Sequence, residues 1–162
     1  MQIRSETSVV VARVPALNVA AFNQNAAADL IDMLRESGDA ILSLVAEDDG
    51  KIAGHVMFSK LTTPPRCLAL APLAVAPDRQ KEGIGTALIK RGLAMAQASR
   101  WRAVFVLGDP AYYTRFGFSV EDAAKFDTPY PKDYTMAREL VPGALKAMDG
   151  ALTYAAPFSA FD

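Results

Sequence analysis

The sequence predicts an α+β fold, and three observations support that prediction. Residues 41–47 and 51–61 are two apolar runs joined by an Asp-Asp-Gly turn at residues 48–50. An Asp-Gly pair between two such runs is typical of an antiparallel hairpin. Residues 26–37 and 84–99 carry apolar side chains at the spacing of an amphipathic helix. Strands and helices therefore share one continuous chain, in which we find no linker or repeat.

The first half of the chain adds three signals. Asn25 can cap the helix over 26–37, and Gly38 stands where a helix ends. Residues 9–22 combine a valine run that favours a strand with a later segment that favours a helix, and we expect a helix there. A third apolar run ends at Val75 and is interrupted by Pro72, which lacks the N–H that a sheet needs. A bulge or an unpaired edge is therefore expected at this proline.

The second half continues with a short buried strand and a capped helix. Residues 103–107 are wholly apolar, as in a strand that is buried on both faces. Asp109 followed by Pro110 is typical of a helix start, and the Phe-Gly-Phe sequence at 116–118 ends that helix. The last two expected elements are strands at residues 134–140 and 151–158.

Composition and charge narrow the class of protein. The 162 residues are 51% hydrophobic and 22% charged, and 17 Lys and Arg nearly balance 18 Asp and Glu. These values are typical of a soluble globular protein, and they argue against a nucleic-acid binder or a polybasic membrane-binding protein. The length suits a single domain over residues 1–162. Because the chain shows no secretory signal and no apolar stretch of about 18 residues, we expect a cytoplasmic protein.

The single cysteine, Cys67, cannot form an internal disulfide, and no Cys/His spacing indicates a metal site. A thiol nucleophile is conceivable at this position. Since Cys67 lies in an apolar run, a small buried side chain is the favoured interpretation.

A glycine-containing loop leads from the third apolar run into the helix over 84–99. Gly83 and Gly85 allow the backbone to curl so that successive N–H groups and the positive end of the helix meet an anion such as phosphate. The dinucleotide-binding fingerprint needs a third small residue where Leu88 stands, and the Walker loop needs a Gly-Lys-Ser/Thr sequence that is absent. Taken alone, the segment is most simply an ordinary loop before a packed helix.

The neighbouring segments change that interpretation. Gln80-x-x-Gly83-x-Gly85 follows a strand that ends Leu-Ala-Val, and residues 108–118 read Gly-Asp-Pro-Ala-Tyr-Tyr-x-Arg-Phe-Gly-Phe. Together they resemble the GNAT family of N-acetyltransferases, and within it a subgroup of predicted bacterial N-acetyltransferases. The resemblance runs nearly end to end and is most specific over residues 72–118.

The resemblance implies a mixed, mostly antiparallel central sheet flanked by helices, with splayed fourth and fifth strands that hold acetyl-CoA between them. The backbone of residues 81–86 would receive the pyrophosphate, and residues 73–75 would pair with the pantetheine arm and bind the thioester oxygen. Lys81 stands where the family often has a further glycine, and Glu82, where a basic residue is frequent, must point away from the phosphates. The cofactor-binding residues implied in this way are Leu73, Ala74, Val75, Gln80, Lys81, Glu82, Gly83, Ile84, Gly85, Thr86 and Asp109.

The resemblance also implies a catalytic acid. Tyr113 matches the family tyrosine that protonates the departing thiolate, whereas Tyr112 is interpreted as a packing residue or a pocket wall. His55, the only histidine, is the candidate base, although a structural role is favoured for it. Asp109 lies near the splayed strands, but a helix cap is the favoured role. A chain of water molecules could replace either group as the base.

These residues predict an acetyl-CoA-dependent N-acetyltransferase in which an amine of a small molecule or peptide attacks the thioester directly. One alternative is a non-catalytic acyl-CoA sensor, because residues 67–75 contain no carboxylate that could act as the base. Another alternative is a nucleotide-binding protein. Homodimers are common among proteins of this fold, and no segment of the sequence identifies an interface.

Overall fold

A single six-stranded sheet organises the computed structural model, which describes residues 1–5 and 26–161. The strands lie in chain order, and all neighbours are antiparallel except β4 and β5, which are parallel. The mixed, mostly antiparallel sheet is therefore confirmed. The helix expected over 9–22 lies outside the described residues. The strands are β1 Gln2–Ser5, β2 Ala40–Asp48, β3 Lys51–Lys60, β4 Cys67–Val75, β5 Ala103–Leu107 and β6 Thr135–Glu139.

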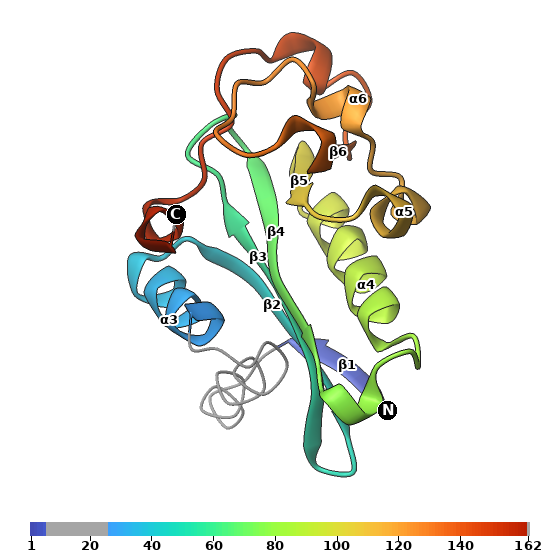
Figure 1. Ribbon diagram of the computed structural model, residues 1–162. Helices are drawn as coiled ribbons and strands as arrows, with labels where there is room; N and C mark the ends of the chain where they lie inside the picture. The colour runs from blue at the N-terminus through green and yellow to red at the C-terminus, as the bar shows by residue number, and fades with distance from the viewer. Residues whose placement is uncertain (6–25, 162) are drawn as a thin grey trace.

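Helices cover both faces of the sheet (Figure 1). The α-helices are α3 Ala26–Ser37, α4 Ile84–Ala98, α5 Pro110–Tyr113 and α6 Val120–Ala123. The short 3-10 helices are η1 Pro77–Arg79, η2 Thr114–Phe116, η3 Lys132–Tyr134, η4 Leu145–Ala147 and η5 Ala156–Phe161. Among the described residues, none of these helices has the length and apolar character needed to cross a membrane.

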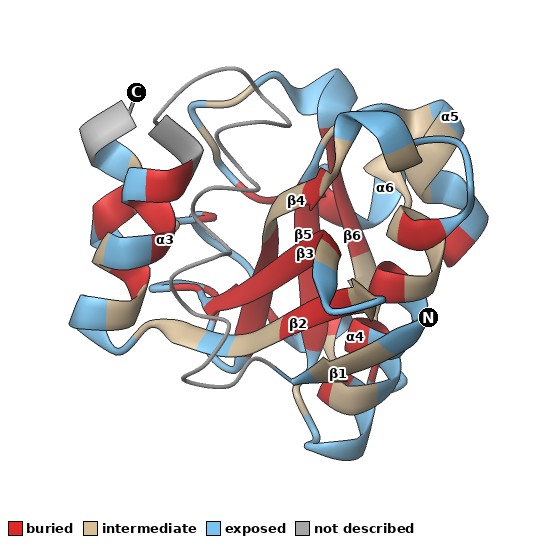
Figure 2. Ribbon diagram, turned by 90° about the horizontal axis from the view of Figure 1, so that it is seen from below, coloured by how far each residue is buried: buried red, intermediate tan, exposed pale blue. Residues whose placement is uncertain are grey.

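Three hydrophobic clusters lie between the sheet and its coverings. One joins α4 to residues such as Val56 and Phe58 of β3. The other two lie on the opposite face, where α3 and the carboxy-terminal segment pack against side chains such as Met57 and Phe105. Figure 2 shows the buried residues concentrated in the central strands and on the inward sides of the helices. The site therefore rests on strands whose side chains are fixed on both faces.

Glycine allows α4 to lie close to β3. A Cβ atom at Gly54 would lie 2.8 Å from Cγ2 of Ile84, and a Cβ atom at Gly92 would overlap the ring of Phe58. Protein cores are close-packed, so neither position has room for a larger side chain.

Replacing Gly92 with alanine is expected to lower the free energy of unfolding by about 1–3 kcal/mol, because the added methyl group overpacks the core against Phe58. This loss opposes the gain of about 1 kcal/mol that alanine normally brings to a helix interior. Urea or thermal unfolding measures the change. The reverse substitution Ala94→Gly, at an exposed position of the same helix, is the control, because it measures the difference in helix propensity between alanine and glycine without a change in core packing. A Gly92→Ala protein with a higher Tm than wild type would contradict this packing.

The predicted irregularity at Pro72 is a β-bulge. Val56 pairs with Leu73 and Phe58 pairs with Leu70, so two residues of β4 oppose one residue of β3. On the other side, β4 pairs with β5 only from Cys67 to Ala69, and β4 continues to Val75 without that neighbour. The splay between the fourth and fifth strands is therefore present, and it begins just before the bulge.

The expected strand at 151–158 is wrong. Ala151 and Thr153 make only single bridges, to Asp127 and Thr63, and the chain then turns into η5. Pro157 cannot donate to a ladder, and the apolar side chains of this segment instead cover the two clusters on the α3 face, where Leu152 is buried. The hairpin at 48–50, the helix over 84–99 and the strand inside 134–140 are confirmed.

Candidate active site

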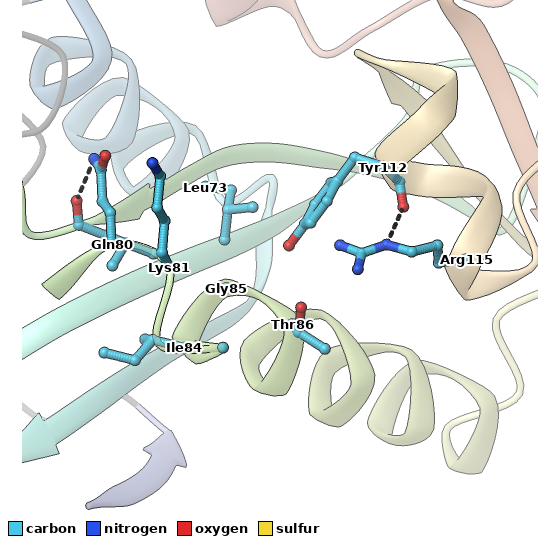
Figure 3. Close-up of a pocket in the computed structure, with 10 residues that line it drawn as sticks. Leu73, Gln80, Lys81, Ile84, Gly85, Thr86, Tyr112 and Arg115 are labelled. Carbon is cyan, nitrogen blue, oxygen red and sulfur yellow. Dashed lines mark hydrogen bonds between the residues drawn. The ribbon is translucent and has the colours of Figure 1, made fainter.

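A cleft of about 400 Å³ opens beside the splayed end of β4. The strand and the loop after it form one wall, the first turn of α4 forms the floor, and α5 with η2 forms the other wall (Figure 3). The lining residues are Leu73, Val75, Gln80, Lys81, Gly83, Ile84, Gly85, Thr86, Tyr112 and Arg115. All but Tyr112 and Arg115 belong to the set predicted to bind the cofactor.

The floor is an uncapped helix start. Gly83 has a φ of 85°, in the left-handed region that glycine adopts readily, and no side chain of the described residues caps α4. The carbonyl of Gly83 accepts the first helical hydrogen bond, from the N–H of Ala87. The N–H groups of residues 84–86 therefore have no acceptor within the helix and lie at its positive end. This arrangement can bind an anion.

The loop side chains hold the backbone in that shape. Nε2 of Gln80 donates to the carbonyl of Val75 at 3.3 Å, which ties the loop to the end of β4. Lys81 has a φ of 69°, a left-handed conformation that suits the glycine frequent in the family at this position. The ammonium group of Lys81 extends from the exposed loop at one side of the cleft.

Glu82 lies outside the set of cleft-lining residues. Nε of Arg79 lies 3.1 Å from each carboxylate oxygen of Glu82, and a terminal nitrogen of Arg79 lies 3.1 Å from Asp48 at the end of β2. The carboxylate is thereby directed towards Arg79, as the sequence required if an anion is to sit at the start of α4.

The end of β4 offers an open backbone edge. One edge pairs with β3, through Leu73 with Val56 and Ala74 with His55. Within residues 1–5 and 26–161, no strand pairs with the edge towards β5 beyond Ala69. The side chains of Leu73 and Val75 line the cleft. Ala74 is buried with its side chain towards the opposite face and pairs with His55 of β3, so its side chain does not line the cleft.

The second wall contains two residues from the segment after β5. The hydroxyl of Tyr112 lies 3.2 Å from the position that a Cβ atom of Gly85 would take, so the ring reaches across to α4. The guanidinium of Arg115 lies 4.7 Å from the centroid of the Tyr112 ring, and its Nε donates to the Tyr112 carbonyl at 3.3 Å (Figure 3). Tyr112 is thus a pocket wall. The sequence analysis did not identify Arg115 as a site residue. The only signal for it was its spacing of three residues from Tyr112, which places the two side chains on one face of a helix.

Tyr113 lies at the point where β5 ends. Its ring packs against Gly108, the residue that follows β5, and meets the Phe118 ring edge to face with centroids 5.9 Å apart. Burial, together with the neighbouring Tyr112, raises the pKa of Tyr113 to about 12. The phenol therefore keeps its proton at neutral pH, as a general acid requires. Asp109 caps α5, since its carboxylate accepts from the N–H of Ala111 at 3.0 Å, and it does not line the cleft.

His55 is fully buried on the α3 face of β3, and its Nε2 lies 2.8 Å from Oγ of Ser43. Burial, with a smaller contribution from the positive charge of Arg35, lowers the pKa of His55 to about 3. A neutral, solvent-inaccessible imidazole with so low a pKa fits the structural role better than that of a base. Cys67 is also fully buried, and burial raises the pKa of its thiol to about 11, which confirms the small buried side chain and leaves no reactive thiolate at neutral pH.

Comparison with known proteins identifies the class. The sequence model of the acetyltransferase (GNAT) family matches residues 12–118, and the chain belongs to that family. The chain is 34% identical over 169 residues to the uncharacterized N-acetyltransferase YhbS of Escherichia coli K12, an alignment that covers 99% of this chain and all of that protein.

Two solved structures extend the similarity to three dimensions. The crystal structure of E. coli YhbS in complex with CoA matches with a TM-score of 0.92 and 32% identity, over 99% of this chain and 93% of that one. A GNAT family acetyltransferase from Brucella melitensis in complex with acetyl-CoA matches with a TM-score of 0.83 and 32% identity, over 97% of each chain.

Proposed function

We propose that this protein transfers the acetyl group of acetyl-CoA to an amine of a small molecule or peptide. The observation that carries the proposal is a cleft that joins an uncapped helix start to an open strand edge at the splay in the sheet. Tyr113, whose ring packs against the cleft residue Tyr112, lies beside it. The complexes of the two similar acetyltransferases with CoA and acetyl-CoA support the choice of co-substrate.

The residues of the cleft fit acetyl-CoA. The N–H groups at the start of α4 would bind the pyrophosphate, and no carboxylate lies among the described residues that line the cleft. The open edge of residues 73–75 would bind the pantetheine amides as an added strand does. A backbone N–H beside the bulge would bind the thioester oxygen and hold it more strongly as negative charge develops there.

The reaction needs two proton transfers. The amine nitrogen attacks the carbonyl carbon, a C–N bond forms, and the C–S bond breaks to release the thiolate. Tyr113 would give its phenolic proton to the sulfur and regain one from solvent. Before the attack, the acceptor ammonium would lose its proton to water to give the free amine, because the candidate base His55 is inaccessible and its pKa is about 3.

Turnover is favoured over a sensor function. A sensor would need only the cleft, whereas this chain also has a partly buried tyrosine, Tyr113, just beyond the end of β5. The similar proteins are named N-acetyltransferases, which agrees with catalysis.

Two measurements test the proposal. Thermal-shift titration is expected to show stabilisation by CoA and acetyl-CoA but not by ATP or NAD, because only the former extend a pantetheine arm along β4. Thiol release from acetyl-CoA is then followed with a panel of amines. Stabilisation by CoA with no turnover on any amine would favour the sensor. Stabilisation by ATP or NAD alone would favour the nucleotide-binding alternative.

A further inference from the structure

One cation in the cleft has no part in the chemistry described above. Arg115 lies on η2, on the opposite side of the cleft from the loop at 80–83, and it lines the cleft even though it is exposed. The backbone groups assigned to the pyrophosphate and the thioester belong to α4 and β4, so a cationic side chain on this wall calls for a different anionic partner.

The side chain of Arg115 is oriented before any ligand arrives. Its Nε is used by the Tyr112 carbonyl at 3.3 Å, and its guanidinium lies over the Tyr112 ring at 4.7 Å and near the Phe116 ring at 5.7 Å. These contacts leave the two terminal nitrogens without a hydrogen-bond partner in the part of the chain that the structure describes. Such a pair of parallel donors matches a phosphate bidentately.

The charge of the cleft also favours an anion. Lys81 and Arg115 are the charged residues among those that line it in the described structure. The carboxylate of Glu82, in the loop before α4, is engaged by Arg79 at 3.1 Å. Arg115 therefore has no counter-ion within the cleft.

We propose that Arg115 binds the 3′-phosphate of coenzyme A and thereby selects CoA over dephospho-CoA. The inference rests on the proposed function. The 3′-phosphate is a monoester that carries nearly two negative charges at neutral pH and has three terminal oxygens. The helix start already supplies N–H groups to the pyrophosphate, whereas no backbone site is assigned to the 3′-phosphate. Arg115 thus supplies a cationic side chain to the cleft from the second wall.

Isothermal titration of the intact protein with CoA and with dephospho-CoA tests the assignment. The wild type is expected to bind CoA at least about tenfold more tightly, since a charge-assisted hydrogen bond contributes about 1.5–3 kcal/mol. Arg115→Gln should abolish most of that preference and leave the Kd for dephospho-CoA within about twofold of wild type. Arg115→Lys should retain part of the preference, because lysine keeps the positive charge but lacks the two parallel N–H donors of the guanidinium.

Arg91→Gln is the matched control, because Arg91 is exposed on α4 and does not line the cleft. It removes the same charge and should keep the wild-type preference. An equal loss of affinity for both ligands in Arg115→Gln would overturn the assignment and point to the pyrophosphate, and an unchanged ratio would overturn it outright. If wild type binds neither ligand, the proposed function fails instead, which separates the two failures.

Discussion

Tyr113→Phe is expected to lower kcat for acetyl transfer by about 10²–10⁴-fold, the range typical of a lost general acid. The KM for acetyl-CoA should change little, because phenylalanine preserves the packing of the Tyr113 ring against Gly108 and Phe118. Steady-state thiol release with a reactive amine measures both constants.

The pH dependence gives a second readout of the same tyrosine. Burial raises the pKa of Tyr113 to about 12, so its neutral phenol is retained as pH rises through the ordinary tyrosine value of about 10. The wild type should therefore show no loss of kcat from tyrosine ionisation below about pH 10. Tyr134→Phe, at an exposed position outside the cleft, removes an equivalent hydroxyl and should leave kcat unchanged. An unaltered kcat in Tyr113→Phe would remove the acid from the mechanism.

Gly85→Leu is expected to weaken CoA binding by about 10- to 100-fold, as overpacking of a close contact costs about 1–3 kcal/mol. A Cβ atom at Gly85 would lie 3.2 Å from the Tyr112 hydroxyl and 3.6 Å from Cγ2 of Val75, so a leucine would extend into the cleft that we propose for the pantetheine arm. Isothermal titration with CoA measures the loss.

Folding should survive the Gly85→Leu change, because leucine is the better helix former and the cleft is open to solvent. Circular dichroism and Tm check this directly. Ala98→Leu, at the exposed end of the same helix, is the control for an added apolar side chain and should bind CoA as wild type does. CoA binding at wild-type strength in Gly85→Leu would move the pantetheine path away from this cleft.

The first wall and the floor of the site could be predicted from sequence because their information is local. A strand, a loop with Gly83 and Gly85, and a helix follow one another without interruption, so the backbone that would bind an anion is fixed within residues 73–86. The capping role of Asp109 could also be predicted from sequence, since an N-cap acts over only a few residues.

The second wall depends on tertiary contacts that no local pattern encodes. Arg115 lines the cleft only because α5 and η2 pack across from α4, and a helix as short as α5 has no period to show which face is inward. The sequence favoured a structural role for His55 but could not show which face of the sheet it occupies, because a strand has two faces and the sequence does not say which one α3 covers. The segment 151–158 was mistaken for a strand because its apolar composition does not show whether it pairs with a neighbouring strand or packs over the face of the sheet.

The bulge at Pro72 gives β4 two phases of side-chain alternation. Before it, the even-numbered Leu68 and Leu70 face α4, and beyond it the odd-numbered Leu73 and Val75 do so. The extra residue therefore lets large side chains of β4 point to the same face along the whole strand, into the core in its first half and into the cleft in its second half. Deleting a single residue here would exchange Leu73 with Ala74, so the cleft would lose its apolar wall while the core half of the strand kept its register.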